Sequence, residues 1–385
     1  MRHIVICWEF GGGMGHLVPL SLVAAEMKKA GHRVTFVLND IAKAAAYLAP
    51  HDIDWVQAPC IRYRPGKRQL INHADILQMV GYAEVGTLTS LLHAWRSTLK
   101  SLQPDQVVCE YAPTAQLAAR TLGLPCVCID NGFSMPPISD PMPPLQLEKP
   151  ADIARLKASE NGVLLNINKV LVGCGTKPLE RFSDLYADEV WYRNWVEFNH
   201  FGPHSSERHL GQVLGDTGGV APTWPPGEGP KMFAYVKNDH PFAPDILKAA
   251  VAFGFRVLAY LPGRPANVIE ELRATGRIIV SDQPVQLSAL EDDVQVGIWQ
   301  SPTGGVGHSL EKGMRMLFLP SQAEQMLACR AVERSGAPAR VVAAPASWNK
   351  LFEELLEMPN MLFGQRWIPA DLPRMAELLA QHPSI

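Results

Sequence analysis

The start of the chain restricts the fold more than any other segment, because a buried strand there runs into a glycine-rich turn that opens a helix. Residues 3–8 are apolar, residues 11–15 include four glycines, residues 17–30 have helical periodicity, and residues 33–38 are apolar again. Such a βαβ unit predicts a parallel sheet with helices on both faces, whose ligands bind at the carboxyl ends of the strands. We therefore expect a doubly wound α/β fold.

This pattern continues and is then repeated. Strand, helix and strand at residues 106–109, 114–122 and 125–130 extend the first domain. Residues 202–230 are rich in Gly, Pro and Ser, which interrupt regular elements. A second βαβ series follows. Its strands are predicted at residues 232–236, 256–260, 277–280 and 316–319, and its helices at residues 244–253 and 323–334.

These segments predict two Rossmann-like, doubly wound α/β domains that face each other across a cleft. A chain of 385 residues has the natural length for two domains. We expect an N-terminal domain at residues 1–215, a linker at residues 216–230 and a C-terminal domain at residues 231–385. The last helix is expected to pack back on the N-terminal domain.

Composition excludes several classes of function. The net charge is −3 and the basic residues are scattered, so nucleic acid is not expected as a partner. The seven cysteines lack the paired spacing of a disulfide framework or a zinc site, which favours a reducing cytoplasm. No apolar stretch approaches the roughly 20 residues of a membrane-spanning helix, so we expect no transmembrane segment.

The first glycine loop allows two interpretations. Gly12, Gly13 and Gly15 precede His16, whereas a dinucleotide fingerprint would need glycine at the histidine position. Asp40 nevertheless follows the second strand, where a dehydrogenase carries its ribose-binding acid, so that class remains an alternative. His16 at the mouth of the loop either faces a ligand or forms only local hydrogen bonds.

A second glycine loop is predicted in the C-terminal half, at residues 304–307. Glycines beside hydroxyl side chains at a helix N-terminus form an anion site that suits a diphosphate. An ordinary flexible loop is the alternative interpretation. The residues of this candidate site are Thr303, Gly304, Gly305, Val306, Gly307, His308 and Ser309.

The residues 15–19, Gly-His-Leu-Val-Pro, and the acid Glu110 ahead of a helix resemble a pattern in the glycosyltransferases of the GT-B fold. The resemblance is to the bacterial relatives of UDP-glucuronosyl and UDP-glucosyl transferases, and it extends from residue 2 to about residue 341. It implies that the N-terminal domain binds the acceptor beside the first glycine loop. It also implies that His16 is the acceptor-activating base and that Glu110 is its partner carboxylate, with Glu in place of the usual Asp.

The C-terminal half is similar to the same family but departs from it in the donor loop. Glu324 and Gln325 match the acid and glutamine that hydrogen-bond the hydroxyls of the donor sugar. The family's loop histidine is replaced by Thr303 or, in an alignment without gaps, by Gln300. Gln283 stands where relatives stack an aromatic residue on the base.

The resemblance implies transfer of a sugar from a UDP- or dTDP-linked donor to a hydroxyl of a small-molecule, lipid or glycan acceptor. No cofactor is expected beyond this co-substrate, and no metal, because the chain has no D-x-D motif and a helix N-terminus can stabilise the diphosphate. The altered donor loop leaves an alternative, a degenerate GT-B protein that binds nucleotide or glycan without turnover.

Overall fold

The computed structural model describes residues 1–12, 14–61, 70–147, 150–186, 189–215, 218–237, 240–302, 304–343, 347–362, 364 and 367–381. The chain forms two compact units. The first unit contains Met1–Val196, Pro203–Leu210 and Asp371–Ile385, and the second contains Glu197–Gly202 and Gly211–Ala370.

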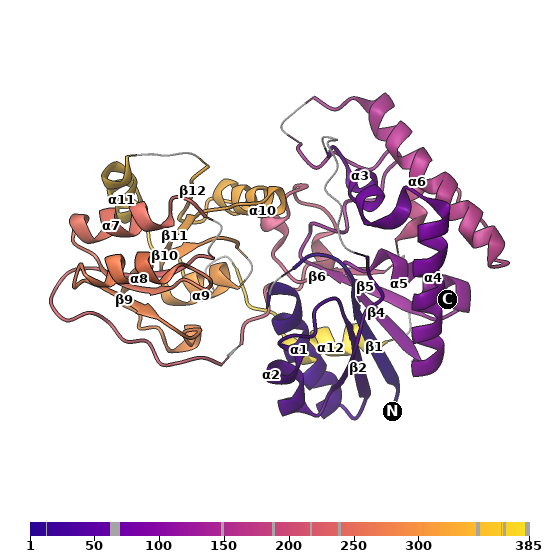
Figure 1. Cartoon of the computed structure of the whole chain (residues 1–385), viewed down its shortest axis with the longest axis horizontal. Helices are drawn as coiled ribbons and strands as arrows, with labels where there is room; N and C mark the ends of the chain where they lie inside the picture. The colour runs from indigo at the N-terminus through magenta and orange to yellow at the C-terminus, as the bar shows by residue number, and fades with distance from the viewer. Residues whose placement is uncertain are drawn as a thin grey trace. The chain divides into compact units, whose positions relative to one another are not determined.

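The first unit is built on a parallel sheet (Figure 1). Among the described residues its strand order is β3-β2-β1-β4-β5-β6, the order of a Rossmann fold, which reverses between β1 and β4. The strands are β1 (His3–Trp8), β2 (Arg33–Leu38), β3 (Asp54–Gln57), β4 (Gln106–Glu110), β5 (Cys126–Asp130) and β6 (Val190–Tyr192).

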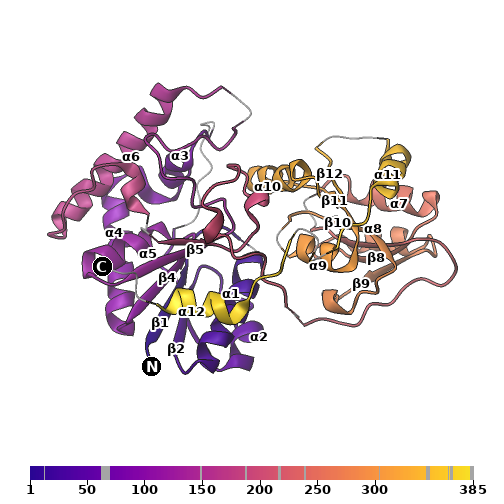
Figure 2. The same ribbon diagram turned by 180° about the vertical axis from the view of Figure 1, so that it is seen from behind.

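Helices cover both faces of this sheet, which explains why β1 and β4 are buried along their whole length. On one face α4 packs against α5 and α6, and on the other α1 packs against α2 and α12. Helix α12, drawn in yellow in Figure 2, therefore belongs to the first unit although it comes from the end of the chain. The helices are α1 (Met14–Lys29), α2 (Ala44–Leu48), α3 (His73–Leu77), α4 (Val85–Leu102), α5 (Pro113–Leu122), α6 (Ile153–Gly173) and α12 (Leu372–Ala380).

The second unit repeats this topology. In the part of the chain that the structure describes, its parallel sheet has the order β12-β11-β10-β7-β8-β9, which reverses between β7 and β10. The strands are β7 (Lys231–Tyr235), β8 (Arg256–Tyr260), β9 (Ile278–Ser281), β10 (Val294–Trp299), β11 (Arg315–Phe318) and β12 (Ala339–Val341). The helices are α7 (Ala243–Phe253), α8 (Ala266–Arg273), α9 (Gly305–Lys312), α10 (Ala323–Arg334) and α11 (Trp348–Glu357).

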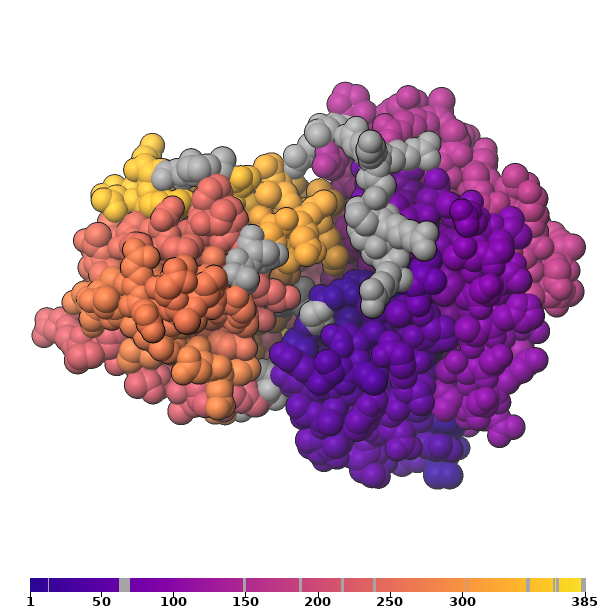
Figure 3. Space-filling model, viewed as in Figure 1, coloured from indigo at the N-terminus to yellow at the C-terminus, as the bar shows by residue number. Residues whose placement is uncertain are grey.

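An aromatic cluster helps to hold the second unit together. Phe253 and Phe255, at the end of α7 and just before β8, pack against Phe352 of α11 with ring centroids 5.5 Å apart in each case. Phe255 and Phe352 are fully buried. Figure 3 shows the outer surface of the chain in the same view as Figure 1, coloured by residue number. Burial of such rings is the main favourable term for packing helices on a sheet.

The predicted fold class, α/β with two Rossmann-like doubly wound domains, is confirmed. The helix at residues 323–334 and the strands at residues 3–8, 33–38 and 256–260 were predicted at their observed bounds. The prediction of loop at residues 304–307 is wrong, because α9 begins at Gly305. Helix α1 likewise begins at Met14, inside the predicted loop at residues 11–15. Among the described residues, no helix has the length and apolar character that a bilayer crossing requires.

Candidate active site

The two residues predicted to carry the chemistry lie where the strand order of the first sheet reverses. Strands β1 and β4 are neighbours there, and Trp8 stands in register with Glu110 at their carboxyl ends. Helix α1 begins at Met14, so its first turn brings His16 to the same strand ends. Ligands of open α/β sheets bind at such a reversal point. The fold therefore joins His16 and Glu110 at the position where a substrate is expected.

His16 and Glu110 form a buried pair. The Nδ1 atom of His16 donates to the carboxylate of Glu110 and lies 2.8 Å from both of its oxygens. The residues are 7% and 1% exposed, respectively. Trp8 stacks on the imidazole with a centroid distance of 5.0 Å and an interplanar angle of 17°. The ring is thus held by a carboxylate at one edge and by an indole on one face.

Gly11 lies against the other nitrogen of this imidazole. A Cβ atom at Gly11 would lie 2.6 Å from Nε2 of His16, closer than side-chain atoms approach each other. The φ of Gly11 is +84°, a conformation that favours glycine. The amide of Phe10 donates to the carbonyl of Tyr111 at 3.0 Å and joins the ends of the two strands. The first glycine loop therefore shapes the surroundings of Nε2.

A cation completes the charged part of the site. Nη2 of Arg193 donates to Oε1 of Glu110 at 2.8 Å, and the side chains of the two residues are 3% and 1% exposed. Burial alone would raise the pKa of Glu110, but the interactions with His16 and Arg193 outweigh it and hold the pKa below its ordinary value. Glu110 is therefore an ionised carboxylate at neutral pH.

Two more buried acids lie at strand ends of this sheet, Asp130 at the end of β5 and Glu9 just after β1. Burial raises the pKa of Asp130 to about 6; the hydrogen bond from Ser134 opposes this shift and the nearby charge of Glu110 adds to it. Burial raises the pKa of Glu9 to about 8, although the amide of Thr114 donates to its Oε2 at 2.8 Å. That contact ties the end of β1 to the first turn of α5.

Sequence reasoning missed these supporting residues. They have one feature in common, which is a position at or just after the carboxyl end of a strand. A search of the predicted strand ends for aromatic and charged residues would have found the three at or just after the ends of β1 and β5; β6 is too short to stand out. The residues are Trp8, Glu9, Asp130 and Arg193.

The second glycine loop occupies the corresponding reversal point of the second unit. Gln300 follows β10, and its Oε1 accepts a hydrogen bond from the amide of Lys237 after β7 at 3.0 Å. Its Nε2 donates to Oγ of Ser321 after β11 at 2.7 Å. Gln300 thus links the ends of three neighbouring strands. Gln300, which takes the place of the expected histidine in the alignment without gaps, is therefore part of a neutral hydrogen-bond network.

Several glycines of this loop are required for packing. A Cβ atom at Gly305 would overlap the ring of Trp299, and one at Gly307 would overlap Leu214. Nε1 of Trp299 donates to Oγ of Ser309 at 2.9 Å. Val306 and His308 are buried in the same short helix. The side chains of the predicted donor loop therefore mainly face the interior of the second unit.

The remaining predicted donor residues lie at the ends of strands and helices. Glu324 and Gln325 are in the first turn of α10, and Oε1 of Gln325 accepts from the amide of Ser321 at 3.0 Å. Gln283 is exposed just after β9. Gly304 is exposed and precedes α9. In the first unit, Gly12 is exposed and Gly15 lies inside α1, while Gly13 and Thr303 lie outside the described residues.

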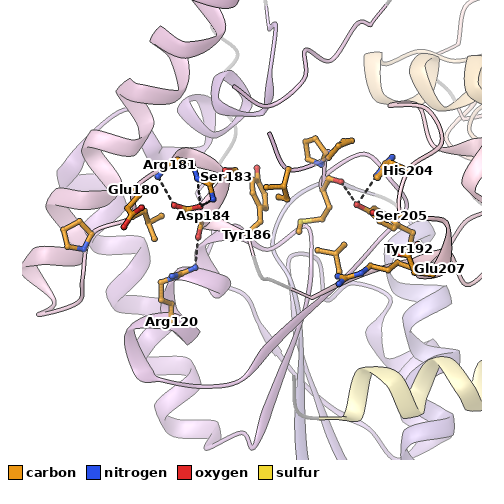
Figure 4. Close-up of a pocket in the computed structure, with 18 of the residues that line it drawn as sticks. Arg120, Glu180, Arg181, Ser183, Asp184, Tyr186, Tyr192, His204, Ser205 and Glu207 are labelled. Atoms are coloured by element: carbon orange, nitrogen blue, oxygen red, sulfur yellow. Dashed lines mark hydrogen bonds and ion pairs between the residues drawn. The ribbon is translucent and has the colours of Figure 1, made fainter. Parts of the chain in front are cut away.

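A separate cavity of about 720 Å³ opens beside β6 in the first unit (Figure 4). Arg181 and Arg120 both contact Asp184 there, through its carboxylate at 2.9 Å and its carbonyl at 2.6 Å. Tyr192 donates to the carbonyl of Met135 at 3.1 Å. The described residues that line this cavity include none of the predicted site residues.

Comparison with known proteins bears on the class of enzyme. Residues 5–159, which include most of β1 and all of α1, β4 and β5, match the family described as Glycosyl transferase family 1. No curated protein matches the chain. The family match supports the predicted class, a glycosyltransferase.

Solved structures confirm the GT-B fold. The chain is similar to the glycotransferase of kitacinnamycin, with 18% identity and a TM-score of 0.68 over 98% of this chain and 93% of that one. It is also similar to SnogD from Streptomyces nogalater, with 18% identity and a TM-score of 0.60 over 99% of both chains. SsfS6 from Streptomyces sp. SF2575, solved with thymidine diphosphate, has 16% identity and a TM-score of 0.58 over 98% of this chain and 100% of that one. The predicted resemblance to GT-B glycosyltransferases is thereby confirmed.

The contact between Gly11 and the imidazole generates a first prediction. Gly11→Ala should displace the ring of His16 and lower kcat of sugar transfer by about 100-fold, since a shift of roughly 1 Å at a reacting group costs that much. The matched control is Gly31→Ala, whose φ of +85° imposes the same strain but whose Cβ would meet open space. Steady-state kinetics of both variants is the measurement. Equal kcat values would show that the position of the imidazole does not limit transfer.

The packing of Gly305 generates a second prediction. Gly305→Ala drives a methyl group into Trp299, and overpacking of this kind costs about 1–3 kcal/mol of stability. Thermal unfolding should show a Tm several degrees below that of Gly86→Ala in the first turn of α4, which also has an ordinary φ but places its methyl group in open space. If the two variants unfold together, the glycine at position 305 is not required by Trp299.

Proposed function

We propose that the protein transfers a sugar from a nucleoside diphosphate sugar to a hydroxyl acceptor, with His16 as general base. The observation that carries this proposal is the buried His16–Glu110 pair at the reversal point of the first sheet. A carboxylate that accepts from Nδ1 leaves Nε2 as the basic nitrogen, as in the triads of hydrolases. Nε2 is also the nitrogen that lies beside the glycine loop.

In the proposed reaction, Nε2 of His16 takes the proton of the acceptor hydroxyl as its oxygen attacks the anomeric carbon. The bond from that carbon to the diphosphate oxygen breaks, and the nucleoside diphosphate leaves with the electron pair. The imidazolium formed in this step lies 2.8 Å from the carboxylate of Glu110, which stabilises it. Glu110 thus orients the base before the reaction and balances its charge afterwards.

The second unit is the proposed donor site. Helix α9 begins after Gly304, which supplies no side-chain cap, so amide groups of its first turn and the positive end of the helix dipole are suited to a diphosphate. We propose that this arrangement takes the place of a metal ion. Two similar proteins, SsfS6 and VinC, were solved with thymidine diphosphate or dTDP, which supports a dTDP- or UDP-linked donor.

The proposed division of labour follows the two βαβ series. Residues 1–215 bind the acceptor, residues 231–385 bind the donor, and residues 216–230 link them. Glu324 and Gln325 bind hydroxyls of the donor sugar from the first turn of α10. We place the enzyme in the cytoplasm, where a reducing environment keeps cysteines such as Cys109 and Cys126, whose sulfurs are 3.7 Å apart, as thiols.

A second candidate function is binding of nucleotide or glycan without turnover. The observation that favours it is Gln300, which occupies the position of the expected histidine in the alignment without gaps. Its side chain is hydrogen-bonded to Lys237 and Ser321. Calorimetric titration with UDP and dTDP, together with an assay of donor-sugar hydrolysis without acceptor, separates the candidates. Binding with no turnover of any donor supports this second function, and measurable hydrolysis or transfer supports the first.

The role of His16 yields a direct test. His16→Ala should lower kcat of transfer by about 10²- to 10⁴-fold, the contribution of a general base, with nucleotide affinity unchanged. Glu110→Gln should also reduce kcat, because it removes the charge that orients and stabilises the imidazole. His51→Ala is the matched control, since His51 precedes β3 at the opposite end of the strands. Equal losses of turnover and donor affinity in His16→Ala would contradict the assignment.

The donor side yields another prediction. Glu324→Ala should weaken binding of the intact sugar nucleotide by about 10- to 100-fold, the value of a hydrogen bond to a charged group, and hardly change binding of the free nucleoside diphosphate. Calorimetry with both ligands is the measurement, and Glu353→Ala on the exposed side of α11 is the control. A variant that loses both ligands equally would show that Glu324 does not read the sugar.

A further inference from the structure

Arg193 contacts the catalytic pair from an element that the family pattern does not include. Its Nη2 donates to Oε1 of Glu110 at 2.8 Å, while both oxygens of the same carboxylate accept from Nδ1 of His16. None of the described residues bonds Nε of Arg193. The guanidinium thus contacts Glu110 through Nη2, in a region where the side chain of Arg193 is 3% exposed.

The backbone around Arg193 is fixed by hydrogen bonds. Its amide donates to the carbonyl of Asp130 at 2.8 Å and extends the β5–β6 ladder by one residue. Nδ2 of the next residue, Asn194, donates to the carbonyl of Asn131 at 2.6 Å. The sheet thus fixes the backbone of Arg193 before any substrate binds. Little reorganisation energy is then needed to place its side chain during the reaction.

The need for this cation follows from the protonation states of the pair. A base must be uncharged before it takes a proton, so in the resting enzyme His16 gives Glu110 no counter-charge. A buried carboxylate without a counter-charge takes up a proton. A protonated Glu110 would donate to Nδ1 of His16, and the imidazole proton would then reside on Nε2. In that tautomer Nε2 cannot accept the proton of the acceptor.

We propose that Arg193 is a positioning residue that keeps Glu110 ionised while His16 is neutral, and thereby fixes the tautomer in which Nε2 is the base. This inference rests on the proposed function of His16. Arg193 touches neither the acceptor nor the donor in this scheme. It acts through Glu110, as the second contact of the carboxylate that holds the imidazole.

The charged and titratable groups that face Glu110 determine the direction of the expected pH effect. These are His16 from α1, Arg193 after β6 and Asp130 at the end of β5. Arg193 is the permanent cation among them, and Asp130 adds negative charge when it ionises. Loss of the cation makes protonation of the His16–Glu110 pair easier, so the apparent pKa of the pair rises. The acidic limb of the pH–rate profile must then move to higher pH.

The test compares Arg193→Met, which retains length without charge, with Arg193→Lys, which retains a charge. The profile of kcat/KM from pH 5.5 to 9.5 should shift upward by about one unit or more in Arg193→Met, the effect of a neighbouring cation. At pH 7 the variant should lose about tenfold or more and recover most of the loss by pH 9. Arg193→Lys should restore much of the original profile. Arg181→Met, at an exposed ion pair, is the control.

A uniform loss at every pH in Arg193→Met, with no rescue by lysine, would overturn the proposal and leave Arg193 a structural role. The tautomer can also be measured without any activity, from the ¹⁵N chemical shifts of His16 at pH 8 to 9. We expect the proton on Nδ1 in the unaltered protein. A proton on Nε2 there would overturn the proposal, even if Arg193→Met failed to fold. A protein with the expected tautomer and no transferase activity would retain the inference about Arg193 and reject the proposed function.

Discussion

The first unit's site depends on one physical constraint, a fully buried carboxylate at the junction of β1 and β4. Removing an ion from water costs several kcal/mol, so Glu110 is stable as an anion only where charge and hydrogen-bond donors surround it. Helix α1 supplies the imidazole of His16 and the residue after β6 supplies the guanidinium of Arg193. These elements meet because the strand order reverses at this point, which leaves the ends of β1 and β4 uncovered by a crossover helix.

The same topology serves a different purpose in the second unit. At its reversal point the strand ends are joined by the neutral side chain of Gln300, and Trp299 fills the space under the first turn of α9. In the proposed function this site receives a charge that belongs to the ligand, so a neutral lining with helix amides is appropriate. In the same proposal the first unit supplies the reacting base, and therefore it must supply the base's counter-charges as well. Two sheets of identical order would thus support acid–base chemistry in one case and anion binding in the other.

How much could be predicted from the sequence depends on the range of the interactions involved. Strands such as β1 and β8 were predicted at their observed bounds because continuous apolar runs are local signals. The start of α9 was predicted wrongly because glycine is a poor helix former, whereas here Gly305 is in the helix where only glycine fits against Trp299. The prediction that His16 and Glu110 act together relied on a family pattern. Arg193 has no such pattern, and its contact with Glu110 spans 83 positions of sequence, so only the folded sheet reveals it.

The glutamate at position 110, where the resemblance to GT-B glycosyltransferases leads us to expect aspartate, can be understood from the same contacts. An aspartate would withdraw the carboxylate by one carbon–carbon bond, roughly 1.5 Å. Each contact of Glu110 with His16 and Arg193 measures 2.8 Å, so a withdrawal of that size would stretch them beyond hydrogen-bond length unless both partners moved. Arg193 cannot follow easily, because its amide is bonded to Asp130, and His16 is confined by Trp8 and Gly11. The longer acid and the arginine are therefore matched to each other, and a glutamate in place of the expected aspartate makes physical sense only when Arg193 is counted as part of the site.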